Sequence, residues 1–172
     1  MADVFTRAKR SEVMSRIRSR GNRDTELALA NLLRAHHITG WRRHFEIRKA
    51  ESGKQKFKVR PDFVFPKLKV AIFVDGCFWH GCPKHATKPK NHRAFWRRKL
   101  AGNKARDRLV TRTLRRAAWH VIRIWEHELQ KRGSRNKERR ASAIVRRIER
   151  ALATIHRRGR TGKLMTEEFS CS

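Results

Sequence analysis

The sequence predicts an α/β fold in which helices pack on a mixed central sheet. Segments with alternating or continuous apolar residues, typical of strands, are interspersed with segments in which apolar residues recur every three or four positions, as in helices. Their order along the chain is a helix, three strands, a helix, a strand and a final helix. This order favours a mixed sheet flanked by helices, and 172 residues are enough for one such domain.

The first half of the chain is expected to form one helix and three strands. Apolar residues at 29–33 lie on one side of the helix, Asn22 or Asp24 is placed to cap its first turn, and Gly40 ends it. Strands are predicted at residues 41–47, 62–65 and 70–74, with a polar connection at 49–56. The third strand is apolar enough for the middle of a sheet.

The second half is expected to form a helix, a strand and a basic helix. Apolar residues from 95 to 114 predict the first helix, weakened at Gly102. A strand follows at 119–125 and a helix across 144–155, and from Gly159 onward the pattern fades, so we expect a mobile tail. We divide the chain into an N-terminal arm or short helix at 1–21, a core at 22–130, and a basic helix and tail at 131–172.

The charge balance points to a polyanionic partner. The chain has 45 Lys and Arg against 15 Asp and Glu, a net charge of +30, and a polyanion would relieve the self-repulsion. No apolar run reaches the length of a membrane-spanning helix, and the N-terminus does not resemble a signal peptide. Three cysteines are too few and odd in number for a disulfide framework. A cytoplasmic, nucleic-acid-associated protein is expected.

Acidic residues lie at the ends of two predicted strands. Asp62 begins one strand and Asp75 ends the next, so the two carboxylates can converge on one Mg²⁺ ion, which would activate water against a phosphodiester. Glu26 is a plausible further acid, and His80 could take the proton from the water. Taken singly, each has an ordinary structural role: strand-end aspartates often serve turns, and Glu26 suits a helix start.

A segment rich in Cys and His, at 76–92, predicts a second metal site. Cys77, Cys82 and His85 are spaced so that one loop can fold around a tetrahedral Zn²⁺. We favour His127 as the fourth ligand, with His92, His80 and Cys171 as alternatives. A site with four protein ligands would be structural. The alternative is that the cysteines are ordinary reduced thiols.

Aromatic and basic residues surround this segment. Phe78 and Trp79 lie inside it, and Phe95 and Trp96 open the following helix. Such side chains can wedge between base pairs and unstack a duplex, although each could instead pack in the core. Basic residues between Lys84 and Arg108 are expected to contact phosphates.

Several strings of residues resemble the very-short-patch-repair (Vsr) DNA mismatch endonuclease family. The resemblance runs from about Arg10 to Leu129. Its motifs are Arg10-Ser with Met14, Arg23-Asp-Thr with Glu26, Arg60-Pro-Asp-Phe-Val64, Phe73-Val-Asp-Gly-Cys-Phe-Trp-His80 with Cys82, Phe95-Trp96 with Lys99, Asn103 with Arg106-Asp107, and Trp119 with Trp125-Glu126. The string Gly-Cys-Phe-Trp-His beside Arg-Pro-Asp is highly specific.

The resemblance implies a restriction-endonuclease-like fold of the PD-(D/E)XK type, with a catalytic Mg²⁺ and a structural Zn²⁺. It implies nicking of one DNA strand 5′ to the thymine of a T:G mismatch, which arises when 5-methylcytosine is deaminated, to start very short patch repair. The implied metal ligands are Asp62 and the Val74 carbonyl, with His80 as general base and Glu26 as a supporting acid.

The resemblance also implies roles in DNA binding. Phe78, Trp79 and Trp96 match residues that enter the duplex, and the segment around Met14 matches an arm on the DNA. Arg23, Lys99 and Asn103 are further expected DNA contacts. Some members have His where Asp75 stands, so a metal role for Asp75 is inferred from its carboxylate alone.

Expected partners are double-stranded DNA with a T:G mismatch and, functionally, mismatch-repair proteins and a cytosine-5 methyltransferase, in a bacterial cytoplasmic protein that associates with the nucleoid. We expect a monomer that does not bind membranes. Two alternatives remain: a metal-dependent DNA nuclease without mismatch specificity, and a non-catalytic zinc-stabilised nucleic-acid-binding module.

Overall fold

A mixed four-stranded sheet forms the centre of the protein. The computed structural model describes residues 25–49, 57–87, 89–129 and 134–167. The strands of the sheet, in spatial order, are β1 (Arg42–Arg43), β4 (Phe63–Phe65), β5 (Val70–Asp75) and β6 (His120–Trp125). Strand β4 is antiparallel to both β1 and β5, whereas β5 and β6 are parallel. The predicted mixed α/β architecture is confirmed.

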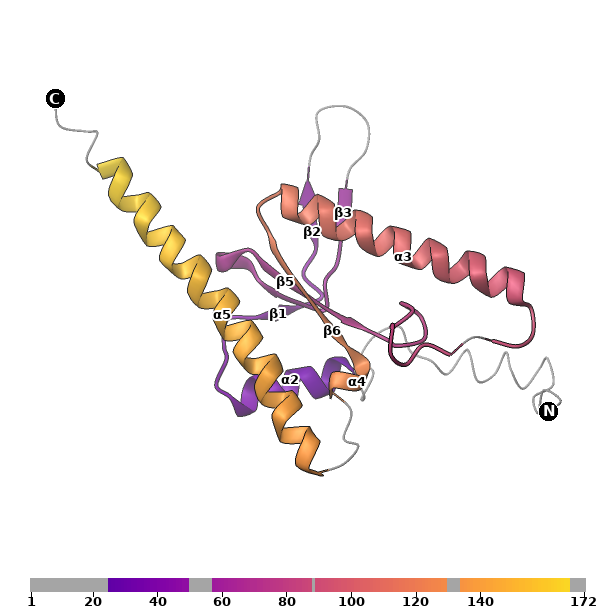
Figure 1. Cartoon of the computed structure of the whole chain (residues 1–172). Helices are drawn as coiled ribbons and strands as arrows, with labels where there is room; N and C mark the ends of the chain where they lie inside the picture. Colours follow the sequence, from indigo (N-terminus) through magenta and orange to yellow (C-terminus); the bar gives the residue numbers. More distant parts are fainter. Residues whose placement is uncertain (1–24, 50–56, 88, 130–133, 168–172) are drawn as a thin grey trace.

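Helices cover both faces of this sheet (Figure 1). Helices α2 (Glu26–Ala35) and α5 (Ser134–Glu167) lie on one face; helix α3 (Arg93–Arg116) lies on the other, together with a separate antiparallel pair, β2 (Ile47–Lys49) and β3 (Phe57–Val59). A short helix α4 (Glu126–Leu129) follows β6, and a 3-10 turn, Pro66–Leu68, joins β4 to β5. No helix in the described part of the chain is long and apolar enough to cross a membrane.

The alternation of side chains along the strands builds two cores. Phe63 and Phe65 of β4 face α2 and α5, whereas Val64 between them faces α3. In β5 and β6 the same alternation directs Ile72 and Ile124 toward α2 and α5. All five side chains are buried, so the strand ends that carry the polar residues are held in a fixed register.

The single strand predicted at 41–47 is wrong. Residues 42–43 belong to the main sheet and residues 47–49 to the small β2–β3 pair. Between them His44 has a φ of +56°, a left-handed conformation that turns the chain. The partner strand β3 and helix α4 were not predicted, because elements of three or four residues leave almost no periodic pattern.

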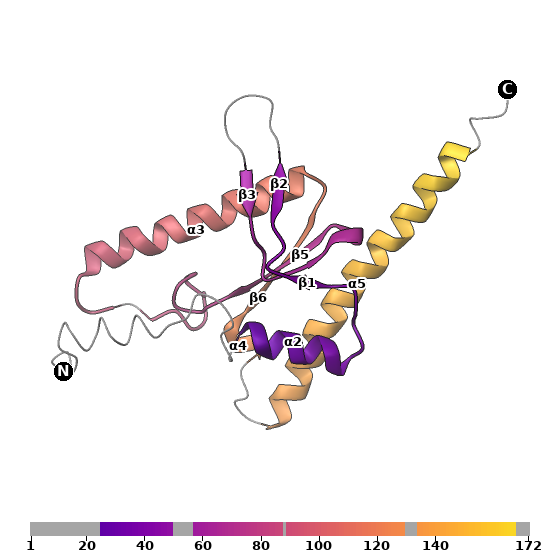
Figure 2. The ribbon, with the colours of Figure 1, turned by 180° about the vertical axis from the view of Figure 1, so that it is seen from behind.

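The two long helices extend further than their sequence patterns. Helix α3 runs unbroken through Gly102, and α5 continues to Glu167, past Gly159 where the apolar pattern fades. Ile144 and Ile148 of α5 are buried in the core, so this helix is packed on the sheet, while its C-terminal part projects beyond it (Figures 1 and 2).

The start of α2 differs from the prediction. Thr25 occupies the N-cap position, and the helix ends at Ala35, five residues before Gly40. The predicted caps Asn22 and Asp24 lie outside the described residues. The expected N-terminal arm at 1–21, with Met14, and the expected DNA contact Arg23 lie outside them as well.

Candidate active site and metal cluster

Three acidic side chains gather where β4 begins and β5 ends. Pairing of Phe63 with Ile72 brings Asp62 beside the end of β5, where Asp62 Oδ2 accepts a 2.7 Å hydrogen bond from the Val74 N–H. The pKa of Asp62 is raised from 3.8 to about 6: burial is the largest cause, the carboxylates of Glu26 and Asp75 add to it, and the hydrogen bond from Val74 opposes it. The structure therefore brings together Glu26, Asp62 and Asp75, which the sequence placed on three separate elements.

Basic partners distinguish the three carboxylates. Glu26 is buried and accepts a 2.5 Å hydrogen bond from Arg43. Asp75 is buried and accepts two 2.6 Å hydrogen bonds from Arg123, one on each oxygen. Asp62 has no hydrogen bond or ion pair to a basic side chain in the described part of the protein. This pattern leaves Asp62 as the carboxylate most available to a cation and disfavours the direct metal contact expected for Asp75.

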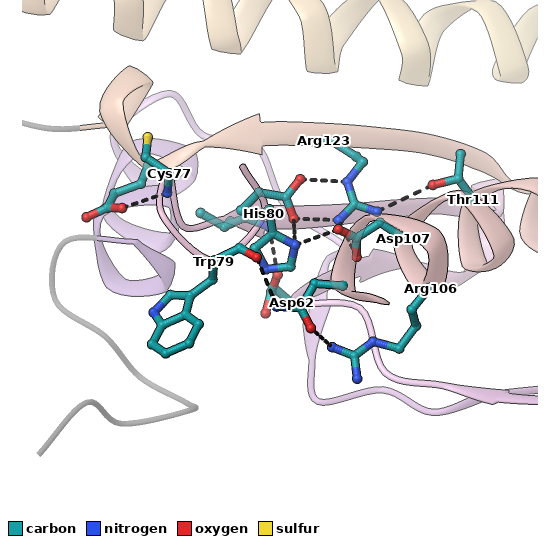
Figure 3. Close-up of polar contacts among 12 residues, drawn as sticks. Asp62, Cys77, Trp79, His80, Arg106, Asp107, Thr111 and Arg123 are labelled. Carbon is teal, nitrogen blue, oxygen red and sulfur yellow. Dashed lines mark hydrogen bonds and ion pairs between the residues drawn. The ribbon is translucent and has the colours of Figure 1, made fainter. Parts of the chain in front are cut away.

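His80 lies next to this group and is held by a further carboxylate, that of Asp107 (Figure 3). Its Nδ1 is 2.6 Å from Asp107 Oδ2 and 3.6 Å from Asp75 Oδ1. With a carboxylate at Nδ1, the proton of a neutral imidazole resides there, and Nε2 keeps its lone pair. No described side chain forms a hydrogen bond with Nε2. The arrangement can accept a proton at Nε2 while Asp107 fixes the ring.

Arg123 joins the two carboxylates that flank His80. Besides its two bonds to Asp75, its Nη2 lies 3.0 Å from Asp107 Oδ1, and its Nη1 lies 3.4 Å from Thr111 Oγ1. Burial lowers the pKa of Arg123, but the hydrogen bonds and charges of Asp75 and Asp107 outweigh this and raise it above its usual value. The guanidinium thus remains charged and clamps both carboxylates.

The roles of Asp107 and Arg123 were not identified from the sequence. Asp107 stands in the Arg106-Asp107 motif and Arg123 in a strand-like segment, and neither position by itself indicates a function. A signal for Arg123 does exist: it is a charged residue between Ile122 and Ile124, in a strand that is otherwise apolar at its centre. A buried strand keeps such a residue when a carboxylate on the neighbouring strand pairs with it.

The four predicted zinc ligands converge on one point. The ligand atoms of Cys77, Cys82, His85 and His127 all lie within 4.8 Å of one another. Cys77 Sγ is 3.2 Å from His127 Nδ1, and Cys82 Sγ is 3.6 Å from the same atom and 3.8 Å from His85 Nδ1. Bond lengths of 2.3 Å to sulfur and 2.0–2.1 Å to nitrogen require tetrahedral edges of about 3.4–3.8 Å, so these residues fit a metal ion.

The protonation chemistry of this cluster suits a cation. Burial raises the pKa of the Cys77 thiol to about 11, opposed by a hydrogen bond from His127 and reinforced by Cys82. Two neighbouring thiolates in this place therefore need a compensating positive charge. Burial and then the nearby His85 lower the pKa of His127, which favours the neutral imidazole that a metal requires.

The alternatives for the fourth ligand lie elsewhere. His80 is committed to Asp107, and His92 is the N-cap residue of α3, outside the cluster. Cys171 lies outside the described residues. His127 reaches the loop because α4 follows β6 directly, and β6 lies parallel to β5, from which the loop departs.

Helix α3 and helix α4 hold in place the loop that follows β5 and carries Cys77 and Cys82. Glu126 accepts a 3.0 Å hydrogen bond from the Cys77 N–H, and the Asn103 amide donates a 2.9 Å hydrogen bond to the Trp79 carbonyl. Gly81 has a φ of +61°, and a Cβ there would lie 2.2 Å from Lys104 Cε. Asn103, expected as a DNA contact, thus supports the loop backbone, whereas Lys99 is exposed on α3.

The predicted wedge residues form one aromatic cluster. Phe78 stacks edge-on against Trp79 and Trp96, with ring centroids 5.1 and 5.3 Å apart, and the two tryptophan rings lie 5.9 Å apart. Phe95, beside Trp96, is 54% exposed. Neither core of the fold includes these four rings. They form a partly exposed aromatic surface next to the acidic site.

Comparison with known proteins identifies relatives that align with most of this chain. The sequence model of the family described as DNA mismatch endonuclease Vsr matches residues 2–86. DNA mismatch endonuclease Vsr of Escherichia coli is 35% identical over 152 residues, which cover 87% of this chain and 86% of that protein. Type II nicking enzyme V.XorIIP of Xanthomonas oryzae pv. oryzae is 33% identical over 138 residues, 78% of this chain and 91% of the enzyme.

A shorter match has a higher identity. Type II nicking enzyme V.NaeI of Lentzea aerocolonigenes is 52% identical over 71 residues, which cover 41% of this chain and 43% of that enzyme. The resemblance inferred from the Arg-Pro-Asp and Gly-Cys-Phe-Trp-His motifs is confirmed by the two long alignments. Each of them covers most of this chain and most of the relative. The chain belongs to the DNA mismatch endonuclease Vsr family.

Proposed function

We propose that this protein nicks one strand of duplex DNA 5′ to the thymine of a T:G mismatch, as the first step of very short patch repair. The observation that carries the proposal is the juxtaposition of Asp62, which lacks a basic partner among the described residues, with the His80–Asp107 pair, beside a partly exposed aromatic cluster. The description of the family as DNA mismatch endonucleases and the names of its nicking relatives agree with it. We assign the mixed sheet to the restriction-endonuclease-like, PD-(D/E)XK-type class.

Mg²⁺ fits the acidic group. Its preferred ligands are carboxylate and carbonyl oxygens with several waters, and here one carboxylate, Asp62, lies among other acids without a cation of its own. The N–H and C=O of a strand residue project to the same side, so the Val74 carbonyl faces the Asp62 side. Asp62 and Val74 would hold the ion, which would supply charge neutralisation at the phosphodiester and a more acidic water. Glu26 would support a water ligand.

Residues of the protein then accept the proton of the attacking water. His80 accepts the proton of the attacking water at Nε2, because Asp107 holds the Nδ1–H and thereby fixes the tautomer. Arg123 orients Asp107 through their ion pair, and Asp75 anchors Arg123. In this proposal Asp75 is a positioning residue and not a metal ligand, a revision of the sequence-based expectation that follows from its bidentate ion pair.

The metal cluster and the aromatic rings set the substrate. A Zn²⁺ held by Cys77, Cys82, His85 and His127 would have no open position and would stiffen the loop structurally. That loop carries Phe78 and Trp79 toward Trp96. Wedging these rings into a base step costs a few kcal/mol, and the cost is smaller at a mismatch, where pairing is already weak. A preference for mismatched over fully paired DNA follows from this difference.

The cellular setting follows from the substrate. A protein that acts on deaminated 5-methylcytosine works in the bacterial cytoplasm at the nucleoid, in functional connection with a cytosine-5 methyltransferase and with mismatch-repair proteins. We propose that it acts as a monomer. The expected DNA contacts Lys99, Met14 and Arg23 remain part of this proposal.

A strand-resolved nicking assay tests the function. Duplexes with T:G, T:A or C:G at one position and randomised flanks are labelled differently on each strand and incubated with Mg²⁺ or in Mg²⁺-free buffer. We expect a nick on the thymine strand of the T:G duplex in the presence of Mg²⁺. Equal cleavage of the T:A duplex would favour the nuclease without mismatch specificity, and binding without cleavage would favour the non-catalytic module.

A further inference from the structure

A shallow hollow of about 610 Å³ lies between α3 and β6, next to Asp107 of the acidic site. It is lined by Asp107, Arg108, Thr111, Arg112, Arg115, Arg116 and Arg123. Five of these seven residues are arginines and one is acidic. We call this feature the arginine groove. Trp79 and Thr111 lie on opposite sides of His80 in Figure 3, so the groove and the aromatic cluster flank the same site.

The arginines of the groove differ in their partners. Arg123 is paired with Asp75 and Asp107 at the inner end. Arg108, Arg112, Arg115 and Arg116 are exposed, and within the described residues none of these four side chains has a hydrogen bond or an ion pair. Their spacing of four, three and one residues places all four on one side of α3.

Such an array is unfavourable in the isolated protein. Like charges three or four residues apart on a helix destabilise it by about 0.2–0.5 kcal/mol per pair. The described side chains offer these four no carboxylate to relieve the repulsion. An anionic ligand with several charges would relieve it, and guanidinium groups are well suited to bind phosphate oxygens.

The groove is continuous with the acidic site. Asp107 lines its inner end and also holds His80. From Asp107 to Arg116 the helix rises about 13 Å, a length that matches about four phosphates of one strand at 3.4 Å each along the duplex axis. A strand whose scissile phosphate lies at Asp62 and His80 therefore has its neighbouring phosphates within reach of these arginines.

We propose that the arginine groove binds the phosphate backbone of the duplex that flanks the nicked position, on the side of the site away from the aromatic cluster. This inference rests on the proposed function for its DNA ligand. The groove would position the substrate without reading its sequence, because phosphate contacts carry no base information. The mismatch would then be held between the aromatic cluster and the arginine groove.

The test compares two triple variants of the full chain. Arg112→Gln, Arg115→Gln and Arg116→Gln remove three charges from the groove. Arg139→Gln, Arg146→Gln and Arg150→Gln remove three exposed charges from α5, which packs on the other face of the sheet. Binding to a T:G duplex is measured by fluorescence anisotropy in Mg²⁺-free buffer from 0.05 to 0.4 M salt, after thermal melts have shown both variants to be folded.

Each phosphate contact contributes about 0.9 to the slope of log affinity against log salt. One contact therefore strengthens binding about eightfold at 0.1 M salt relative to 1 M salt. We expect the groove variant to lose about 500-fold in affinity and about 2.7 in slope, and the α5 variant to lose much less. An affinity loss in the groove variant no larger than in the α5 variant, or an unchanged slope, would overturn the inference. The same anisotropy measurement with an RNA duplex is a further check. If the groove variant loses affinity for the RNA duplex but not for the DNA duplex, the inference is overturned as well.

The outcome separates the groove from the proposed reaction. If the wild-type protein nicks T:G duplexes and the groove variant binds them normally, the groove assignment fails and the nickase stands. If the wild-type protein binds but never nicks, and the groove variant binds poorly, the nickase proposal fails and the groove stands.

Discussion

Neutralising Asp62 should make the protein more stable while it removes nicking. The carboxyl is largely buried, and its pKa is raised from 3.8 to about 6, first by burial and further by Glu26 and Asp75. The folded state thus binds the proton more tightly than the unfolded state. The stability contribution of this group is full below pH 3.8 and is lost as the pH rises to about 6. Above pH 6 the folded protein carries an unfavourable charge.

The pKa shift sets the size of the effect. At 1.36 kcal/mol per pKa unit, the raised pKa corresponds to at most about 3 kcal/mol of lost stability at pH 8. Asp62→Asn keeps the shape of the side chain and an oxygen that can accept the Val74 N–H. In the absence of Mg²⁺ the variant should therefore be more stable than wild type by up to about 3 kcal/mol, or about 6–12 °C in Tm for a chain of this size.

The assay is thermal unfolding of both proteins between pH 4 and 8 in Mg²⁺-free buffer without chelator, so that an ion at the Cys and His cluster is retained. The gain should grow between pH 4 and 6 and then level off, and added Mg²⁺ should stabilise wild type but not the variant. Glu46→Gln is the control of opposite sign, since a hydrogen bond from Lys58, with others from Arg48 and Arg60, lowers the pKa of Glu46 to about 2. That variant should not gain stability above pH 4.

Two results would refute the reasoning. If Asp62→Asn is no more stable than wild type at pH 8, the carboxylate is not held in an unfavourable environment. If the gain is the same at pH 4 and pH 8, it does not come from the charge. The variant should also lose nicking with Mg²⁺ while it keeps or improves DNA binding; lost binding in a folded variant would count against the metal role.

Three further predictions concern the other parts of the site. Cys82→Ser should release the bound metal ion and lower the Tm by several degrees, because it removes a buried ligand; an ion retained at one per chain by elemental analysis would contradict the cluster. His80→Ala should lower the single-turnover nicking rate by about 10²–10⁴-fold without weakening DNA binding, and Asp107→Asn should lower it less; an unchanged rate in His80→Ala would exclude it as the base. Trp79→Ala should reduce the preference for T:G over T:A in the strand-resolved assay, and an unchanged preference would refute the wedge.

The site could be partly predicted because its residues are marked chemically in the sequence. Cys77, Cys82 and His85 are close along the chain, so one loop can bring them together whatever the rest of the fold does. His127 was the harder prediction, since it needed β6 to lie beside β5. Asp62 and Asp75 were found because each stands at the edge of an apolar run.

The partners of those residues could not be predicted in the same way. Whether Asp75 binds a metal or an arginine depends on the register in which β6 pairs with β5, which sets Phe73 opposite Arg123. Asp107 reaches His80 only because α3 packs across the same face of the sheet, and Asn103 meets the Trp79 carbonyl for the same reason. The break at His44 likewise depends on a backbone conformation that the alternating pattern does not reveal.

The sequence by itself determined the α/β class and the family, and it placed three candidate metal ligands in one loop and two aspartates at strand ends, because local periodicity and rare residue types at short spacing carry that information. The tertiary structure alone decided which carboxylate is left for a cation, what orients His80, and that four arginines of α3 line a groove leading from the site. These features depend on side chains from elements far apart in the chain, and only packing and strand register bring them within a few ångströms of one another.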